Sequence, residues 1–360
     1  MTRVPVGPTP LERLDAFQQR HSWLGLPIAV AYRFFENSGM HLVAALAYYA
    51  LVAAVPLLLL AAIAVATMLD FFPDLQPYLV RSPIASIPMV GERIRNPDGG
   101  NPSIWLLVIA VAGSLYGGIG IGQAFQHAMN TIWSVPRNQR PNPFTARLRS
   151  LGILGLAAVS ITLSTGLAML GPQLRLGRGW SRPLTFLMSV PVNAAIFIVA
   201  MRLATAHPMP VRRILAGAIG CGIVWQLFQQ TGMAYFRTEL PKATTAGQFA
   251  NLVLALVGVL HLTALALVLA GELNAVLVRG LWPRALLTPF TDRVRLTDAD
   301  RISYAAQARM MRYKAYQHVK VEWTDHHDPA LDRIRTYEAD VAEAEVHQAD
   351  GAAPAPPVTR

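Results

Sequence analysis

The chain has 360 residues, of which 53% are hydrophobic and only 14% charged, and its formal net charge is +10. About a quarter of the residues of a water-soluble globular protein are charged, so this composition argues against a soluble protein and favours a membrane protein. The only cysteine, Cys221, excludes an intrachain disulfide.

Six long stretches lack Asp, Glu, Lys and Arg, and each can hold one membrane-spanning helix. A hydrocarbon core of about 30 Å needs roughly 20 helical residues. The stretches are continuously apolar rather than alternating, so helices are favoured over strands. We therefore predict an all-α, polytopic integral membrane protein, with a bundle of six transmembrane helices within residues 40–285. The predicted spans are approximately 41–69, 104–133, 151–170, 184–201, 214–236 and 250–278.

Residues 1–39 show no short apolar core followed by a small-residue cleavage site, so we do not expect a signal peptide there. Leu11, Leu14 and Phe17 recur at near-helical spacing among charged residues, as Ile28 and Tyr32 do further on. This pattern predicts a helix lying along the cytoplasmic membrane surface, although a solvated leader remains the alternative.

The lysines and arginines of the loops predict that both termini are cytoplasmic, because this orientation places fifteen of them inside and eight outside. Residues 286–360 form a predicted cytoplasmic tail with a basic helix at about 298–320, capped by Thr297 or Asp298, and a disordered end. The basic residues of that helix can be read as a solvated face or as a surface for anionic lipid. They are Arg301, Arg309, Arg312, Lys314 and Lys320.

Small residues four apart predict close helix packing in the second and fifth spans. Gly113 and Gly117, Gly118 and Gly122, and Gly217 with Cys221 have this spacing. In the first span, Pro56 lacks an amide donor, so we expect a kink there.

Polar side chains within the spans carry the functional prediction, because they are costly in lipid and tend to face a bundle interior. The candidate substrate-lining residues fall in three predicted spans: Gln123, His127 and Asn130; Gln226 and Gln230; and His261 and Glu272. One interpretation is a hydrated cavity that binds a polar headgroup or ion, with the histidines and Glu272 exchanging protons. The alternative is a set of interhelical hydrogen bonds that fixes the bundle.

Several segments together resemble the YihY/BrkB family of membrane proteins, across roughly residues 35–285. They contain Ala44–Ala50 before Pro56, Asn130–Trp133, the stretch from Pro208 to Tyr235, and Gly271–Asn274. The tail from Leu296 to Arg301 is similar to the branch called inner membrane protein YhjD. The residues that carry the resemblance are Tyr48, Tyr49, Pro56, Trp133, Pro208, Gly217, Trp225, Tyr235, Gly271 and Asn274.

The resemblance implies six membrane helices, cytoplasmic ends and a place in the bacterial plasma (inner) membrane. It does not fix the activity, because family labels range from virulence factor BrkB to ribonuclease BN, and lipid export has been proposed for the YhjD branch. Many members have Tyr-Gly after the fifth span, whereas this chain has Gly247-Gln248-Phe249. The resemblance therefore does not imply that this chain shares the substrate specificity of other members.

A ribonuclease would need metal ligands or an acid–base pair that RNA can reach. The densest candidate, Asp325-His326-His327-Asp328, has no second cluster beside it, so we expect no metal site. The chain lacks a Walker-type nucleotide loop. We expect no enzymatic activity, no cofactor and no nucleic-acid partner. The favoured function is binding or translocation of a lipid or another amphiphile, with a non-catalytic envelope scaffold as the alternative.

Overall fold

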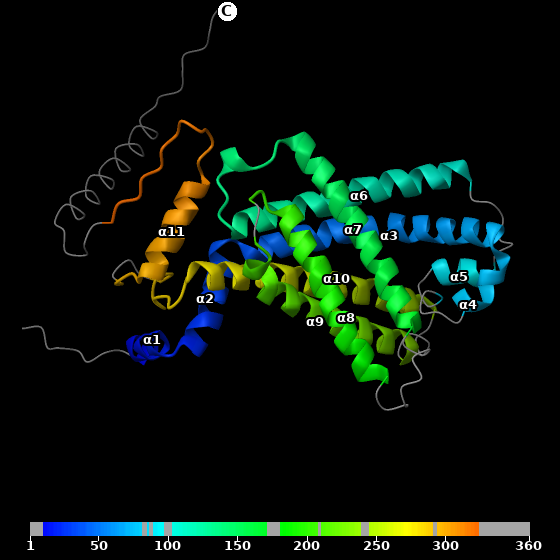
Figure 1. The fold of residues 1–360 in the computed structure, drawn as a ribbon, viewed down its shortest axis with the longest axis horizontal. Coiled ribbons are helices and arrows are strands. Elements are labelled where there is room, and N and C mark those ends of the chain that lie inside the picture. Colours follow the sequence, from blue (N-terminus) through cyan, green and yellow to red (C-terminus); the bar gives the residue numbers. More distant parts are fainter. Residues whose placement is uncertain are drawn as a thin grey trace, which may run out of the picture.

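The structure is a computed structural model, and every regular element in its described part is a helix (Figure 1). It describes residues 10–80, 85, 89–96, 103–170, 181–207, 210–238, 245–290 and 294–323. The side chains of 161–170, 181–188, 228–238 and 245–252 lie outside that description.

Six helices of 24 to 35 residues build the body of the molecule, and each overlaps one of the six predicted spans. They are α3 (Gly39–Phe71), α6 (Ile104–Ile132), α7 (Pro143–Leu170), α8 (Ser181–Ala204), α9 (Val211–Thr238) and α10 (Thr245–Arg279). Three described segments are long and apolar enough to cross a membrane, namely Gly39–Phe71, Ile104–Ile132 and Val253–Arg279, and Ser189–Ala204 is a shorter apolar helix. The all-α fold and its membrane character are therefore confirmed.

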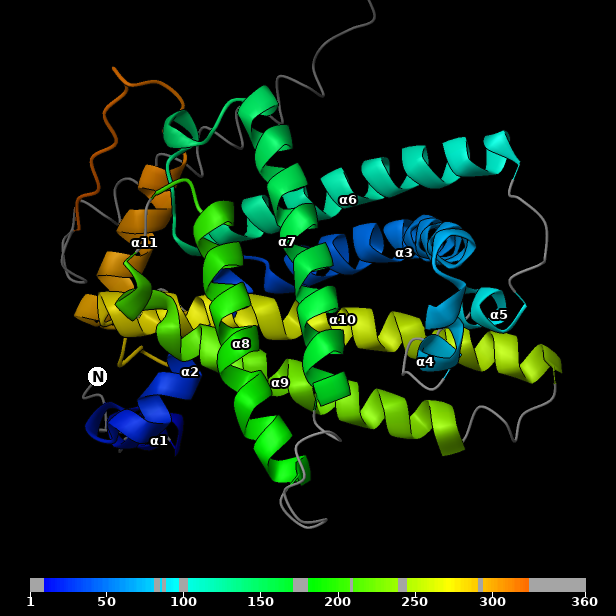
Figure 2. The same cartoon turned by 45° about the vertical axis from the view of Figure 1, so that its right-hand side comes forward.

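The long helices are not all parallel. The axes of α3, α6, α9 and α10 are broadly aligned, whereas α7 and α8 cross them steeply (Figure 2). The largest interfaces join α3 to α6, α8 to α9, and α10 to α9. The main apolar core draws on α2 and all six long helices, and it contains Phe34, Leu46, Met129, Trp133 and Val268.

Shorter elements cover the two ends of this bundle (Figure 1). One end carries η1 (Pro73–Leu75), α4 (Gln76–Val80) and α5 (Val90–Arg95). The other end carries α1 (Pro10–Arg20), α2 (Ser22–Glu36), α11 (Asp298–Met310) and the turn η3 (Arg137–Gln139).

Glycines let α6 lie very close to both of its neighbours. A Cβ on Gly117 would come within 2.6 Å of the Ala53 Cα in α3, and one on Gly122 within 2.5 Å of the Ser150 Cβ in α7. Only glycine permits these backbone approaches. The predicted packing role of the small residues is confirmed.

One detail differs from the sequence-based expectation. The basic tail helix ends at Met310, about ten residues before the predicted end, because Met311 onward leaves the helical conformation. Its start is as expected: Thr297 and Asp300 form a reciprocal capping box. The first long helix continues through Pro56 as one element.

Candidate functional site

The carboxyl end of α6 closes in a tight turn, and this turn positions the surrounding residues. The Val135 N–H donates to the Asn130 carbonyl and the Ser134 N–H to the Thr131 carbonyl, both at 2.8 Å. These are the two bonds of a Schellman motif. Ser134 has φ of +47°, in the left-handed region where glycine is usual. The turn therefore holds a serine in an unfavourable backbone conformation.

Two arginines from other helices bind the remaining carbonyls at this end of α6. Arg33 of α2 donates from Nη2 to the Ile132 carbonyl at 2.7 Å, and Arg279 of α10 donates to the Trp133 carbonyl. The last four carbonyls of a helix lack intrahelical partners and carry partial negative charge, so cations stabilise them. All four, from residue 130 to 133, are satisfied here.

Arg33 is also part of a buried ion pair with Glu272 of α10. Its Nε lies 3.5 Å from Glu272 Oε2, and both side chains are fully buried. Asn37 donates to Glu272 Oε1 at 2.6 Å, and Arg33 Nη1 donates to the Ser303 hydroxyl at 3.1 Å. Glu272 therefore joins α10 to α2, and Arg33 continues the connection to α11.

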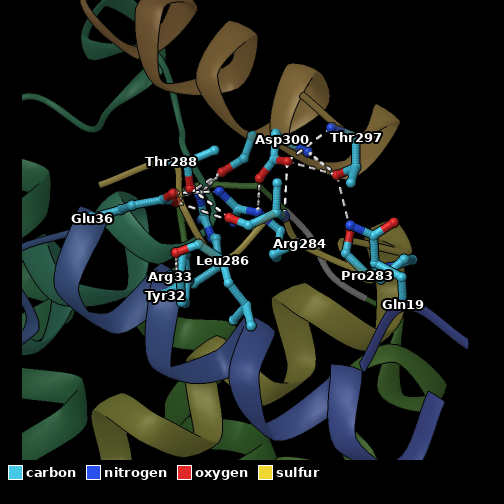
Figure 3. A network of polar contacts seen from close by, with 12 residues as sticks. Gln19, Tyr32, Arg33, Glu36, Pro283, Arg284, Leu286, Thr288, Thr297 and Asp300 are labelled. Atoms are coloured by element: carbon cyan, nitrogen blue, oxygen red, sulfur yellow. Dashed lines mark hydrogen bonds and ion pairs between the residues drawn. The ribbon is translucent and has the colours of Figure 1, made fainter. Parts of the chain in front are cut away.

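A second buried cluster surrounds Arg284, just after α10 (Figure 3). Its Nε donates to Asp300 Oδ1 at 2.5 Å, and its Nη2 donates to Glu36. Asp300 Oδ2 accepts from the Ala285 N–H at 3.1 Å, and the Ser303 hydroxyl donates to Glu36 at 3.1 Å. Helices α2 and α11 and the chain after α10 are thus fastened to one guanidinium.

The surroundings of this cluster fix its protonation. Burial would lower the pKa of Arg284, but its hydrogen bonds to and attraction by Glu36 and Asp300 outweigh burial and raise that pKa. Burial and then the nearby Asp15 raise the pKa of Tyr32. The phenol therefore keeps its proton and donates to the Leu286 carbonyl at 2.5 Å. These groups are suited to holding segments together rather than to exchanging protons.

Three of the seven predicted substrate-lining residues are buried and already hydrogen-bonded. Asn130 Oδ1 accepts from the Ala206 N–H at 2.8 Å, and Gln226 Oε1 accepts from Asn193 at 3.3 Å. Glu272 is the partner of Arg33 and Asn37 described above. Each of these bonds connects two segments that are distant in sequence.

The other four predicted residues lie elsewhere. Gln123 and His127 are exposed on α6, and Arg140 Nη1 lies 3.5 Å from His127 Nδ1. His261 is half-buried in α10, and the side chain of Gln230 lies outside the described residues. The described contacts do not bring the seven residues together into one cavity.

The residues that carry the family resemblance are mostly packing residues. Trp133 and Gly271 are buried, Tyr49 lies against Gly120, and Tyr48 is exposed. Asn274 accepts from the Gly217 N–H at 2.8 Å and donates to the Ile214 carbonyl at 3.1 Å, which fixes α10 to α9. Pro56 contacts the position of Gly113, and Trp225 is half-buried. Pro208 and the Tyr235 side chain lie outside the described residues.

Sequence reasoning missed several buried polar residues. Gln126 donates to the Ala146 carbonyl and the Ser150 hydroxyl, both at 2.9 Å, and so ties α6 to α7. Arg33, Arg284 and Asp300 lie outside the six predicted spans, so the spans do not mark them as buried, yet all three are fully buried. The position of Arg33 and Arg284 within a few residues of an apolar run is a local signal, but their partners lie up to 270 residues away in the sequence and have no local signature.

Among the described residues, no group of three or more His, Cys, Asp or Glu could hold a metal ion. The sequence Asp325-His326-His327-Asp328 lies outside the described residues.

Long apolar helices, glycine-mediated packing and polar groups buried between helices define a polytopic α-helical membrane protein. The family model for Virulence factor BrkB matches residues 30–285, well over half of the chain. The chain belongs to this family, which confirms the YihY/BrkB resemblance. No curated protein and no solved structure gave a significant match.

Proposed function

We propose that this protein binds an amphiphile along the exposed face of α6 and moves its polar headgroup across the membrane. The observation that supports this is a polar stripe on a membrane helix, formed by Tyr116, Gln123 and His127. The three residues are seven and four apart, so they share one face, and all are exposed. The stripe extends about 16 Å along the helix.

Such a stripe is costly if it meets only lipid tails. Polar side chains at membrane depth usually face water, another polar group or a substrate. Arg140 beside His127 adds a cation at the stripe's end near the α6 carboxyl terminus. The headgroup of an amphiphile would follow the stripe while its tails stayed in the bilayer. No covalent chemistry and no cofactor are needed for this role.

The proposal includes six spans in the bacterial inner membrane with both termini cytoplasmic. Exposed aromatic residues at both ends of the bundle support two membrane interfaces, as in aromatic belts. Phe71, Tyr78 and Trp105 lie at one end, and Trp23 and Phe144 at the other. The end with α1, α2 and α11 also carries the arginines of the chain after α10, which favours the cytoplasmic side.

A second candidate function is a scaffold that performs no transport. It is favoured by the buried polar residues of the long helices, because Asn130, Gln226, Glu272 and Asn274 all connect segments within the bundle. Such bonds make a rigid body on which partners could assemble.

The test is headgroup translocation by the full chain reconstituted in liposomes, using phospholipids with a fluorescent headgroup and a membrane-impermeant quencher. The double variant Gln123→Ala with His127→Ala should translocate at least about tenfold more slowly, because polar contacts to the headgroup worth roughly 1.5–3 kcal/mol are lost. The matched control is Leu215→Ala with Ile219→Ala, two exposed side chains four residues apart on α9.

Equal rates for the double variant and the wild type would show that the stripe is not the path. No translocation by the wild type for zwitterionic or anionic phospholipids would favour the scaffold.

A further inference from the structure

We propose that a cavity between the α6–α7 loop, the end of α10 and α11 binds the phosphate group of an anionic amphiphile. The cavity has a volume of about 530 Å³ and is lined by residues of all three segments. None of the three stripe residues of α6 lines it, so this site is separate from the proposed translocation path.

Three arginines give the cavity its charge. Arg279, Arg301 and Arg309 line it. Arg279 donates to the Trp133 carbonyl, whereas Arg301 and Arg309 are exposed and have no acidic partner among the residues that the structure describes. Guanidinium groups form strong, often bidentate hydrogen bonds with phosphate. The cavity therefore presents unneutralised cations to a ligand.

A buried hydroxyl in the same cavity has no partner. Ser134 lines the cavity and is only 8% exposed, and its Oγ makes no hydrogen bond within the described structure. Buried polar atoms are nearly always hydrogen-bonded. Ser134 also occupies the left-handed position of the Schellman turn, where glycine would be less strained. A serine kept there at a backbone cost fits a hydroxyl that donates to a bound phosphate oxygen.

The rest of the lining favours a lipid over free phosphate. Pro136, Ile302, Ala305, Ala306 and Trp323 form apolar walls. A phosphate ion would leave these walls unused, whereas the glycerol backbone and first methylenes of a lipid would cover them. Helix α11, which lines the cavity, lies at the end of the bundle that carries α1 and α2 (Figure 1). A lipid headgroup at a membrane surface on that side would reach the cavity. Basic pockets at the cytoplasmic side of membrane helices suit anionic headgroups.

The experiment measures binding by native mass spectrometry of the full chain in detergent, titrated with phosphatidylglycerol, phosphatidylcholine or inorganic phosphate. The wild type should bind phosphatidylglycerol in preference to both other probes. The double variant Arg301→Gln with Arg309→Gln should bind it about 30-fold more weakly, since each arginine near an anionic headgroup contributes about fivefold. The matched control, Arg13→Gln with Arg20→Gln, removes two exposed charges of α1 and should bind like the wild type.

A second variant separates ligand binding from folding. Ser134→Gly removes the hydroxyl but suits the left-handed backbone, so it should raise the unfolding temperature while weakening phosphatidylglycerol binding about fivefold. Equal losses in the two double variants would show diffuse attraction and overturn the site. Preference for inorganic phosphate would reassign it to the free ion. Unchanged lipid binding by Ser134→Gly would show that the Ser134 hydroxyl does not contact the lipid.

Discussion

The same end of the molecule holds two groups of arginines in opposite circumstances. Arg33 and Arg284 are fully buried and contact carboxylates and carbonyls, whereas Arg301 and Arg309 are exposed in a cavity without acidic partners among the described residues. Arg33 lies in α2, Arg301 and Arg309 lie in α11, and Arg284 lies in the chain between α10 and α11. The two groups differ in whether an acidic side chain of the described structure already neutralises the guanidinium charge.

This difference separates structural from functional roles more clearly than residue type does. A buried charge whose partners are all present fixes the segments that supply those partners, and removing one partner leaves the other uncompensated. An arginine without a partner contributes little to stability and remains free to bind an anion. Substituting a buried arginine should therefore mainly lower stability. Substituting an unpaired arginine should mainly weaken anion binding.

The largest effect is expected for Arg284→Met, which keeps side-chain volume but removes the charge. It leaves Glu36 and the fully buried Asp300 without their cation, so stability should fall by about 3–5 kcal/mol. The measurement is thermal unfolding of the full chain in detergent. As a control, Arg295→Met at an exposed site should stay within about 0.5 kcal/mol of the wild type. Similar midpoints for both variants would mean that the Arg284 cluster is not structural.

An intermediate effect is expected where the bundle is fixed by neutral groups. Gly217→Ala places a Cβ 2.4 Å from the Ala270 carbonyl oxygen and 2.5 Å from Asn274 Nδ2, so it should destabilise by about 1–3 kcal/mol. Gly220→Ala, one turn further along α9, meets nothing within 4 Å and should stabilise by up to about 1 kcal/mol. Unfolding midpoints that shift in opposite directions would confirm the close α9–α10 contact; shifts of one sign would contradict it.

The smallest effect on stability is expected for Arg301→Gln with Arg309→Gln. Both side chains are exposed and unpaired within the described structure, so the unfolding free energy should change by no more than about 0.5 kcal/mol. The same thermal unfolding assay measures it, in lipid-free detergent. A loss as large as that of Arg284→Met would show that these arginines hold α11 in place, and the contrast between the two groups would fail.

The long helices could be predicted from the sequence because their signal is local. An uncharged run of about 20 residues is long enough to cross the bilayer as a helix, and an observed helix covers nearly all of each predicted span. The glycine spacing of α6 was informative for the same reason, since residues four apart share a face. The end of the basic helix was missed because charge density alone does not mark where α11 stops at Met310.

The site was less predictable, because it depends on which partner each polar residue meets. Asn130 and Gln123 looked equivalent in sequence, yet one is buried against the Ala206 N–H and the other is exposed. The seven residues that separate them on α6 place them on the same side of an ideal helix, and only the neighbouring helices decide the difference. Ser134 gave no sequence signal, because neither its left-handed backbone nor its missing hydrogen bond can be read from residue type.

The bond between Asn37 and Glu272 also bears on how the protein is made. The two residues are 235 positions apart, and synthesis at about 5–20 residues per second separates their appearance by roughly 12–47 s. During that time α2 has emerged while its partners on α10 and α11 do not yet exist. Arg33 and Asn37 therefore lack these partners until late in synthesis, and α2 can be joined to α10 only after this last long helix has been made.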